Sequence, residues 1–292
     1  MRLGVVVLPE QRWSEAAARW RRLDDWGYHS AWTYDHLAWR SLADGPWFAT
    51  VTTLAAAALT TSRIRLGTFV ASPNFRHPVP FAKELMSLDD LTDGRLTLGV
   101  GAGGTGVDAS VLGQPELGPG ERVGRFAEFV DLLDRLLTSP STTYDGQWYR
   151  AVDARMVPGC VQRPRVPFVV AANGPRAMTV VARHGQGWVT TGVTPPEDGE
   201  ERWWAGLAGA TARLDEVCTA AGRDPGSLQR LLSVDASGAF GLSSVEHLRD
   251  VVGRAGALGF DEVVVHWPRR DGVYAGDESL LETVAAEVLP DL

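Results

Sequence analysis

The regular alternation of short apolar segments with helical segments is the feature that most constrains this fold. Several apolar segments are dense in Val, Ile, Leu and Phe and lack polar alternation, which indicates strands buried on both faces. The predicted strands are Leu3–Leu8, Ala31–Tyr34, Ile64–Phe69, Leu96–Val100, Phe168–Ala172, Gly187–Thr190, Leu231–Asp235 and Glu262–His266. The predicted helices are Ser14–Trp26, Trp47–Leu59, Val79–Leu91, Arg122–Leu137, Arg176–His184, Glu201–Ala221, Val245–Leu258 and Ser279–Val288.

Eight strands that are each followed by a helix predict a (β/α)8 TIM barrel. An open, doubly wound parallel sheet shows the same alternation, but the number of strands favours the barrel. Residue types at the helix ends agree with this assignment, because Ser is a good N-cap and Gly a good C-cap. The predicted N-caps are Ser14 and Ser244, and the predicted C-cap glycines are Gly27, Gly185, Gly222 and Gly259.

Two stretches interrupt the alternation and predict insertions, one after strand four and one before strand five. The first, Gly101–Gly120, is rich in Gly and Pro. The second, Ser139–Pro167, contains Thr143–Tyr149, which predicts a small hairpin about an Asp-Gly turn. No repeat, linker or low-complexity tract divides the chain, so we expect residues 1–292 to form one domain.

Composition excludes several classes of protein. The net charge of −8 argues against a nucleic-acid or anionic-membrane surface, which needs clustered positive charge. Cys160 and Cys218 are far apart and not near a His at ligand spacing, so we expect no metal site and two free thiols in a reducing cytoplasm. The longest apolar run, Leu54–Leu59, is too short to cross a bilayer, and the N-terminus does not read as a signal peptide.

The loops that follow the predicted strands carry the candidate functional residues, because a TIM barrel builds its active site at that end. These loops combine His, Asp, Trp, Asn and Gly, which suit a site that grips a planar ring and an anionic tail. They are Tyr34–Arg40, Ala71–Pro78, Gly101–Gly104, Ala171–Arg176 and His266–Pro268.

Asp35 and His36 are the first catalytic candidates. An imidazole changes charge near neutral pH and can move a proton beside a reacting ring, while Asp35 could orient it or hold charge. The structural alternative is an Asp that caps a helix beside a packed His. His77 and His266 also follow strands and remain unassigned.

Glycine-rich strand ends are the second group of candidates. Ala171–Gly174 ends a buried strand and opens a helix, so free backbone N–H groups there could bind phosphate; an ordinary strand-to-helix turn is the alternative. Gly99, Gly101 and Gly104 match the spacing of a dinucleotide fingerprint, but a long loop follows where that motif needs a helix. A glycine-lined cavity fits better.

Taken together, these loops resemble the bacterial luciferase-like family of flavin- and deazaflavin-dependent oxidoreductases. The order and spacing of the matching segments carry the resemblance, since each segment alone is modest. They are Trp26–Trp32 leading into Asp35-His36, Arg63–Thr68, His77-Pro78, Leu88–Leu96 with Leu98–Gly101, and Ala171–Pro175.

The resemblance implies a barrel with a flavin or deazaflavin lying across the strand ends. The Asp35-His36 pair resembles the deazaflavin branch, in which the His, here His36, lies beside the reacting face of the ring. A non-proline cis peptide that supports the middle ring would fall at Phe69-Val70, and Ser72 would hydrogen-bond the cofactor. The segments expected to hold the tail and phosphate are Gly101-Ala102 and Ala171, Ala172, Asn173 and Gly174.

One departure bears on the substrate. Sugar-phosphate dehydrogenases of the deazaflavin branch carry a Glu near the strand-four loop, where this chain has Ala102–Thr105 and where Asp108 is the nearest acid. This puts sugar-phosphate oxidation in doubt.

Three functional hypotheses follow. The first is an oxidoreductase that transfers a hydride between the deazaflavin coenzyme F420 and a small organic substrate, with a homodimer as the candidate assembly. The second is an FMN-dependent monooxygenase in which reduced flavin meets oxygen. The third is a non-catalytic barrel. F420 has a long acidic tail that needs basic groups at the rim, and the candidates are Arg40, Arg76 and Arg176.

Overall fold

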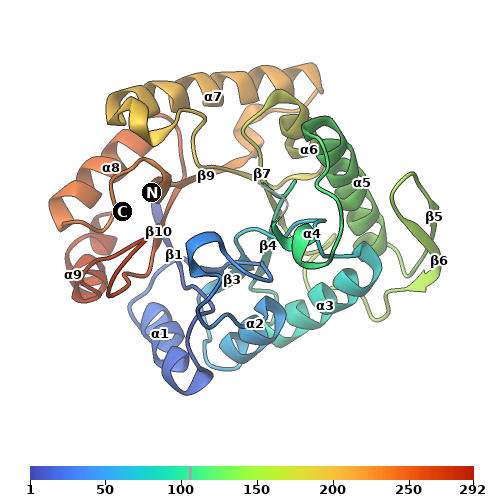
Figure 1. Cartoon of the computed structure of the whole chain (residues 1–292), viewed down its shortest axis with the longest axis horizontal. Helices are drawn as coiled ribbons and strands as arrows, with labels where there is room; N and C mark the ends of the chain where they lie inside the picture. Colours follow the sequence, from blue (N-terminus) through green and yellow to red (C-terminus); the bar gives the residue numbers. More distant parts are fainter. Residues whose placement is uncertain (105–106) are drawn as a thin grey trace.

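The computed structural model describes residues 1–104 and 107–292, and its centre is a closed barrel of parallel strands surrounded by helices (Figure 1). Around the barrel the order is β1-β10-β9-β8-β7-β4-β3-β2, and β1 also pairs with β2. This closure confirms the predicted TIM barrel and rules out the open sheet. The barrel strands are β1 (Arg2–Val6), β2 (Ser30–Thr33), β3 (Arg65–Thr68), β4 (Leu96–Gly101), β7 (Phe168–Ala171), β8 (Gly187–Thr190), β9 (Gln229–Ser233) and β10 (Glu262–His266).

All eight predicted helices are present. They are α1 (Trp13–Asp25), α2 (Thr50–Ala58), α3 (Pro78–Leu91), α5 (Pro119–Thr138), α6 (Pro175–His184), α7 (Glu200–Ala220), α8 (Val245–Ala257) and α9 (Ser279–Glu287). Short 3-10 turns lie between them at η1 (Arg40–Leu42), η2 (Pro196–Asp198), η3 (Pro225–Ser227), η4 (Val234–Ala236) and η5 (Leu289–Asp291). None of the helices in the described ranges has both the length and the apolar character of a membrane span.

Both predicted insertions are confirmed. The first contains a short helix, α4 (Val107–Val111), and Thr105 lies outside the described residues. The second contains an antiparallel hairpin of β5 (Ser141–Asp145) and β6 (Arg150–Arg155), which lies at the periphery beside α5 (Figure 1). The carboxylate of Glu128 on α5 anchors this hairpin, because it accepts hydrogen bonds from the backbone N–H groups of residues 147–149.

The helix ends agree with the sequence in most cases. Ser244 caps α8 and accepts a hydrogen bond from the backbone of His247. Ser14 is not a cap, because α1 begins one residue earlier with Arg12 at the N-cap. Gly185 follows α6 but has φ −75°; a side chain there would crowd backbone oxygens, so the glycine serves close packing. The remaining predicted C-cap glycines, Gly27, Gly222 and Gly259, have positive φ.

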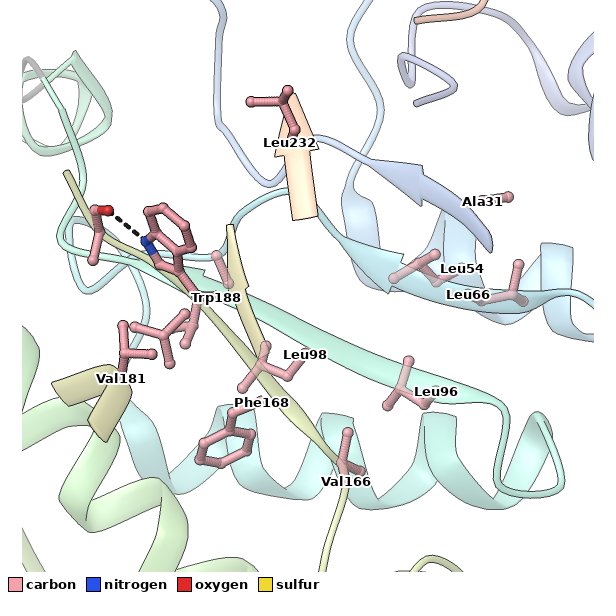
Figure 2. Packing of buried hydrophobic residues seen from close by; sticks show 14 of the residues in the cluster. Ala31, Leu54, Leu66, Leu96, Leu98, Val166, Phe168, Val181, Trp188 and Leu232 are labelled. Carbon is pink, nitrogen blue, oxygen red and sulfur yellow. Dashed lines mark hydrogen bonds between the residues drawn. The ribbon is translucent and has the colours of Figure 1, made fainter. Parts of the chain in front are cut away.

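The strands contribute to two apolar layers, because successive side chains point to opposite faces. Leu3 and Val5 of β1 pack outward against the helices, whereas Val6 points into the barrel. Figure 2 shows part of the outer layer, in which Trp188 lies on β8. The Trp188 indole donates a hydrogen bond of 2.7 Å to the carbonyl of Ala172, which fixes the end of β7 from behind.

Toward the lower end of the barrel, where its strands begin, the ring of Trp32 lies inside the barrel, and a Cβ at Gly67 would collide with this ring. Beside it, the carboxyl group of Glu262 is 4% exposed and accepts a hydrogen bond from Ser30. Burial raises the pKa of Glu262 and outweighs the hydrogen bonds from Ser30 and Trp32. The ionised form is therefore disfavoured in the folded protein.

This burial makes stability depend on pH. A raised folded-state pKa stabilises the fold fully below the unfolded value of 4.5, and the contribution is lost as the pH rises through the folded pKa. Glu262→Gln keeps an acceptor for Ser30 and removes the ionisation. We expect this variant to melt higher than the wild type at pH 8, by about 2 °C or more, and the gap to shrink toward pH 4.

Thermal unfolding followed by circular dichroism at both pH values measures this gap. Glu216→Gln, at an exposed position of α7, is the matched control and should show no such pH-dependent gain. A Glu262→Gln variant less stable than the wild type at pH 8 would mean that the carboxylate stabilises the barrel.

Candidate functional site

A cavity of about 400 Å³ opens at the carboxyl end of the barrel strands, where the sequence predicts the site. Its volume lies within the usual range for small-molecule and cofactor pockets. His36 and eight of the nine predicted cofactor residues line it, namely Phe69, Val70, Ser72, Gly101, Ala102, Ala171, Ala172 and Asn173. The ninth, Gly174, is the N-cap of α6, next to the lining residue Asn173.

One wall is formed where β3 and β4 end. The Phe69-Val70 peptide bond is cis, as the resemblance implies. After it the chain rejoins the sheet, since Ala71 donates to the carbonyl of Gly99 and accepts from the N–H of Gly101. A Cβ at Gly101 would lie 3.0 Å from the Val70 side chain, so a glycine keeps this wall close and smooth.

Asn74 is a lining residue that the sequence reasoning did not single out. Its Oδ1 accepts a hydrogen bond of 2.6 Å from Arg125 on α5, which fixes the amide with Nδ2 as the remaining donor. Gly103 has φ +73°, and a Cβ there would collide with the Asn74 amide. No sequence signal pointed to Arg125, because it belongs to a helix 51 residues away.

The adjoining wall is formed by the ends of β7 and β8, because β7 pairs with β4. Asn173 Oδ1 accepts a hydrogen bond of 2.7 Å from Thr190, and its Nδ2 donates to Thr191 at 3.2 Å. Gly174 then opens α6, with Pro175 in the first turn. A Cβ at Gly174 would meet nothing within 4 Å, so the space in front of this helix end is open. The first N–H groups of a helix have no intrahelical acceptor, so this end can bind an anion.

His36 is held on one ring nitrogen. Its Nδ1 lies 2.7 Å from Oδ2 of Asp108 on α4, and Oδ1 of Asp108 accepts the backbone N–H of Leu37 at 2.7 Å. Asp108 is 2% exposed. Because Asp108 occupies Nδ1, Nε2 is the nitrogen that remains for a ligand in the cavity. The carboxylate that orients His36 is therefore Asp108, which the sequence identified as the nearest acid in its loop but not as the partner of His36.

Asp35 does not orient His36, so of the two roles expected for Asp35 only the second, holding charge, agrees with the structure. Its carboxylate is fully buried and forms a two-point salt bridge with Arg76, at 2.6 Å to Nη2 and 3.1 Å to Nε. Glu84 holds the other side of the guanidinium at 3.0 Å. Burial works to lower the pKa of Arg76, but the hydrogen bonds and charge of Asp35 outweigh it and raise that pKa.

The same salt bridge corrects the prediction that Arg76 is a basic group available to the acidic tail of the cofactor. Arg76 is committed to Asp35 and Glu84, so it is not a free rim cation. Arg40 does line the cavity and stacks 4.6 Å above the ring of Trp39. Arg176 is exposed in the first turn of α6.

Two alternative kinds of site, a dinucleotide-binding loop and a metal site, can be compared with this geometry. Gly99 and Gly101 belong to β4 and lead into the insertion rather than into a long helix, so the dinucleotide fingerprint lacks its structural context. Within residues 1–104 and 107–292, no cluster of three or more His, Cys, Asp or Glu side chains could hold a metal ion. The cavity therefore offers backbone donors, small apolar surfaces and a positioned imidazole.

Comparison with known proteins gives curated relatives of two kinds. An F420-dependent glucose-6-phosphate dehydrogenase from Beutenbergia cavernae is 36% identical over 195 residues, which is 65% of this chain and 56% of the relative. A 4-hydroxyprotoasukamycin monooxygenase from Streptomyces nodosus subsp. asukaensis is 36% identical over 186 residues, 61% of this chain and 46% of the relative. The chain thus spans about half the length of these relatives. An uncharacterized protein of Mycobacterium tuberculosis is 28% identical over 99% of both chains.

Solved structures share the fold over the whole chain. The coenzyme F420-dependent tetrahydromethanopterin reductase from Methanopyrus kandleri has a TM-score of 0.78 with 18% identity, over 99% of both chains. An F420-dependent secondary alcohol dehydrogenase has a TM-score of 0.82 with 16% identity, over 99% of this chain and 98% of that one. The sequence model of the luciferase-like monooxygenase family matches residues 1–239, which is most of the chain. The chain therefore belongs to the luciferase-like monooxygenase family.

Proposed function

We propose that this protein is an oxidoreductase that transfers a hydride between coenzyme F420 and a small organic substrate. The observation that carries the proposal is the cavity at the strand ends. It brings His36 together with three segments of small or apolar residues, Phe69-Val70, Gly101-Ala102 and Ala171–Asn173. The relatives named as F420-dependent dehydrogenases support the same cofactor.

The residues present fit a deazaflavin. The segments at Phe69-Val70 and Gly101-Ala102 would hold the ring, because glycine and alanine leave backbone and small apolar surface exposed to it. The end of α6 at Gly174, where a Cβ would meet nothing, would hold the phosphate. Arg40 and Arg176 are placed to attract an acidic tail.

When bound, a deazaflavin supplies or accepts a hydride, that is, two electrons at once. The chain must then manage the proton, because reduction of a C=O, C=N or activated C=C bond leaves a basic centre. We assign this proton to Nε2 of His36. Asp108 holds the ring by Nδ1 and balances the charge of the imidazolium.

The acid found near the strand-four loop in sugar-phosphate dehydrogenases has no counterpart at Ala102, Gly103 or Gly104. Asp108 does not replace it, since both of its oxygens are used by His36 and Leu37. We therefore propose a substrate other than a sugar phosphate.

An FMN-dependent monooxygenase is the second candidate. The observation in its favour is the monooxygenase relative, which is as similar as the dehydrogenase. The same cavity would hold either ring, so the choice depends on the tail. A non-catalytic barrel is disfavoured by the size of the cavity and by the His36–Asp108 pair.

Several broader expectations remain predictions. They are a single domain over residues 1–292, a homodimer, a cytoplasmic location and the lack of nucleic-acid or membrane partners. The net charge of −8 supports the last of these.

Cofactor choice gives a direct prediction. We expect the purified apo-protein to bind oxidised F420 with a dissociation constant in the micromolar range or tighter, and FMN at least about tenfold more weakly, a difference of about 1.4 kcal/mol. The basic rim is the physical reason, since F420 has the longer acidic tail. Ultraviolet-visible titration of both cofactors under one buffer measures the difference, and tighter binding of FMN would favour the monooxygenase.

The role of His36 gives a second prediction. If Nε2 carries the proton, His36→Ala should lower turnover by about 10²-fold or more and remove one ionisation from the pH profile. The probes are oxidised F420 with propan-2-ol, and reduced F420 with cyclohex-2-en-1-one. Asp108→Asn is the matched variant, because it keeps an acceptor for Leu37 and removes the charge that faces Nδ1 of His36; it should lower turnover less than His36→Ala does. Weaker cofactor binding with an unchanged pH profile would mean that His36 only positions the ring.

A further inference from the structure

A second group of polar side chains runs from Tyr34, which lines the cavity, to the end of β10. The hydroxyl of Tyr34, which follows β2, lies 2.7 Å from Nε2 of His266 at the end of β10. Nδ1 of His266 lies 2.7 Å from Oδ2 of Asp235 in η4. Tyr34 lines the cavity, whereas Asp235 is buried behind it. The three residues form a continuous path from the cavity into the protein.

The geometry around Asp235 fixes the direction of these hydrogen bonds. Its Oδ1 accepts the backbone N–H of Gly241 at 2.7 Å, and its Oδ2 accepts the backbone N–H of His266 at 2.7 Å. A carboxylate with these donors is an acceptor, so Nδ1 of His266 carries the hydrogen that it shares with Asp235. Nε2 is then free to exchange a proton with the Tyr34 hydroxyl.

Two neighbouring residues, Tyr274 and His36, pack against the path from Tyr34 to Asp235. The ring of Tyr274 stacks on His266, with centroids 3.6 Å apart and planes at 7°. The Tyr274 hydroxyl lies 3.0 Å from that of Tyr34. The Tyr34 ring also packs edge-on against His36, with centroids 6.0 Å apart. Tyr34 therefore stands beside the imidazole already assigned to the cavity.

We propose that Tyr34 is a second acid–base group of this site and that His266 and Asp235 form a relay that reloads it with a proton. This inference rests on the proposed hydride-transfer function. Tyr34 is the catalytic residue, because it faces the cavity, and His266 and Asp235 are positioning residues that act through it.

The proton balance is simple. In the reducing direction the cofactor gives a hydride to a carbon of the substrate, and the Tyr34 hydroxyl gives its proton to the adjacent oxygen or nitrogen. The Nε2–H of the His266 imidazolium replaces that proton, and His266 becomes neutral with Nδ1–H still bonded to Asp235. In the oxidising direction each transfer reverses, so the relay gains the one proton that the substrate loses.

The charges around Tyr34 suit this role. Burial, followed by the contact with Tyr274, raises the pKa of Tyr34, so its hydroxyl keeps its proton at neutral pH and can donate it. The groups that face the relay are Asp235, Tyr274, Arg40 and His36. The Asp235 carboxylate lies 2.7 Å from Nδ1 of His266 and so holds the hydrogen of that nitrogen, which leaves Nε2 toward Tyr34.

Protonation of His266 in the apo-protein is the first test. Long-range ¹H–¹⁵N correlation spectra of the histidine-labelled protein report which ring nitrogens carry hydrogen, and His266→Gln assigns the signal among the six histidines. We expect Nδ1 of His266 to carry a hydrogen in the wild type, because Nδ1 faces the Asp235 carboxylate. A His266 with its hydrogen on Nε2 alone would overturn the relay.

Kinetics on the loaded enzyme are the second test, with the same probes as for His36. Tyr34→Phe should lower turnover by about 10²- to 10⁴-fold with F420 affinity unchanged within about twofold. Tyr274→Phe is the matched control, since it removes one hydroxyl that touches Tyr34 but leaves the path to His266, and it should cost less than about tenfold.

A double-mutant cycle separates a relay from independent packing effects. If the residues act as a unit, Asp235→Asn should lower turnover in the wild type but add little in the Tyr34→Phe background. If the losses of turnover from Asp235→Asn and Tyr34→Phe multiply in the double variant, this would contradict the relay. If no probe turns over and no deazaflavin binds, the proposed function fails, whereas the spectra of the apo-protein still decide whether Nδ1 of His266 carries the hydrogen that the relay needs.

Discussion

The pairing of β1 with both β2 and β10 is the constraint on which the rest of the structure depends. It closes the sheet and turns all eight strands so that their carboxyl ends meet at one rim. Segments from both ends of the sequence therefore become neighbours. The contact between Tyr34 and His266 joins residues 232 positions apart, and it exists only because β2 and β10 flank β1.

The two ends of the barrel differ in the size of the side chains that point into the interior. Toward the lower end the ring of Trp32 lies inside the barrel and leaves room only for glycine at Gly67. At the upper end small residues such as Gly101 and Ala102 leave the interior open, and the cavity forms there. Fixed side chains surround this opening, since Arg125 holds Asn74 and Asp108 holds His36. Side chains that are held in this way favour one orientation of a planar ligand.

The strands, the helices and most of the cavity lining could be predicted from the sequence, because local periodicity and loop position specify them. Partners of side chains could not. Asp35 and His36 are adjacent, and adjacent residues in an extended chain point to opposite sides. Asp35 therefore turns into the wall toward Arg76, and His36 faces the cavity and takes its partner from 72 residues away. Nothing local in the sequence records such long-range pairs.

A crystal structure of the protein with oxidised F420 tests the central claim most directly, namely that this cavity holds the cofactor at the strand ends. The account predicts the ring against the wall that the Phe69-Val70 and Gly101-Ala102 segments form together, with Nε2 of His36 toward it and a phosphate at the N–H groups that open α6. A cofactor bound outside this cavity, or a phosphate far from Gly174, would contradict the account.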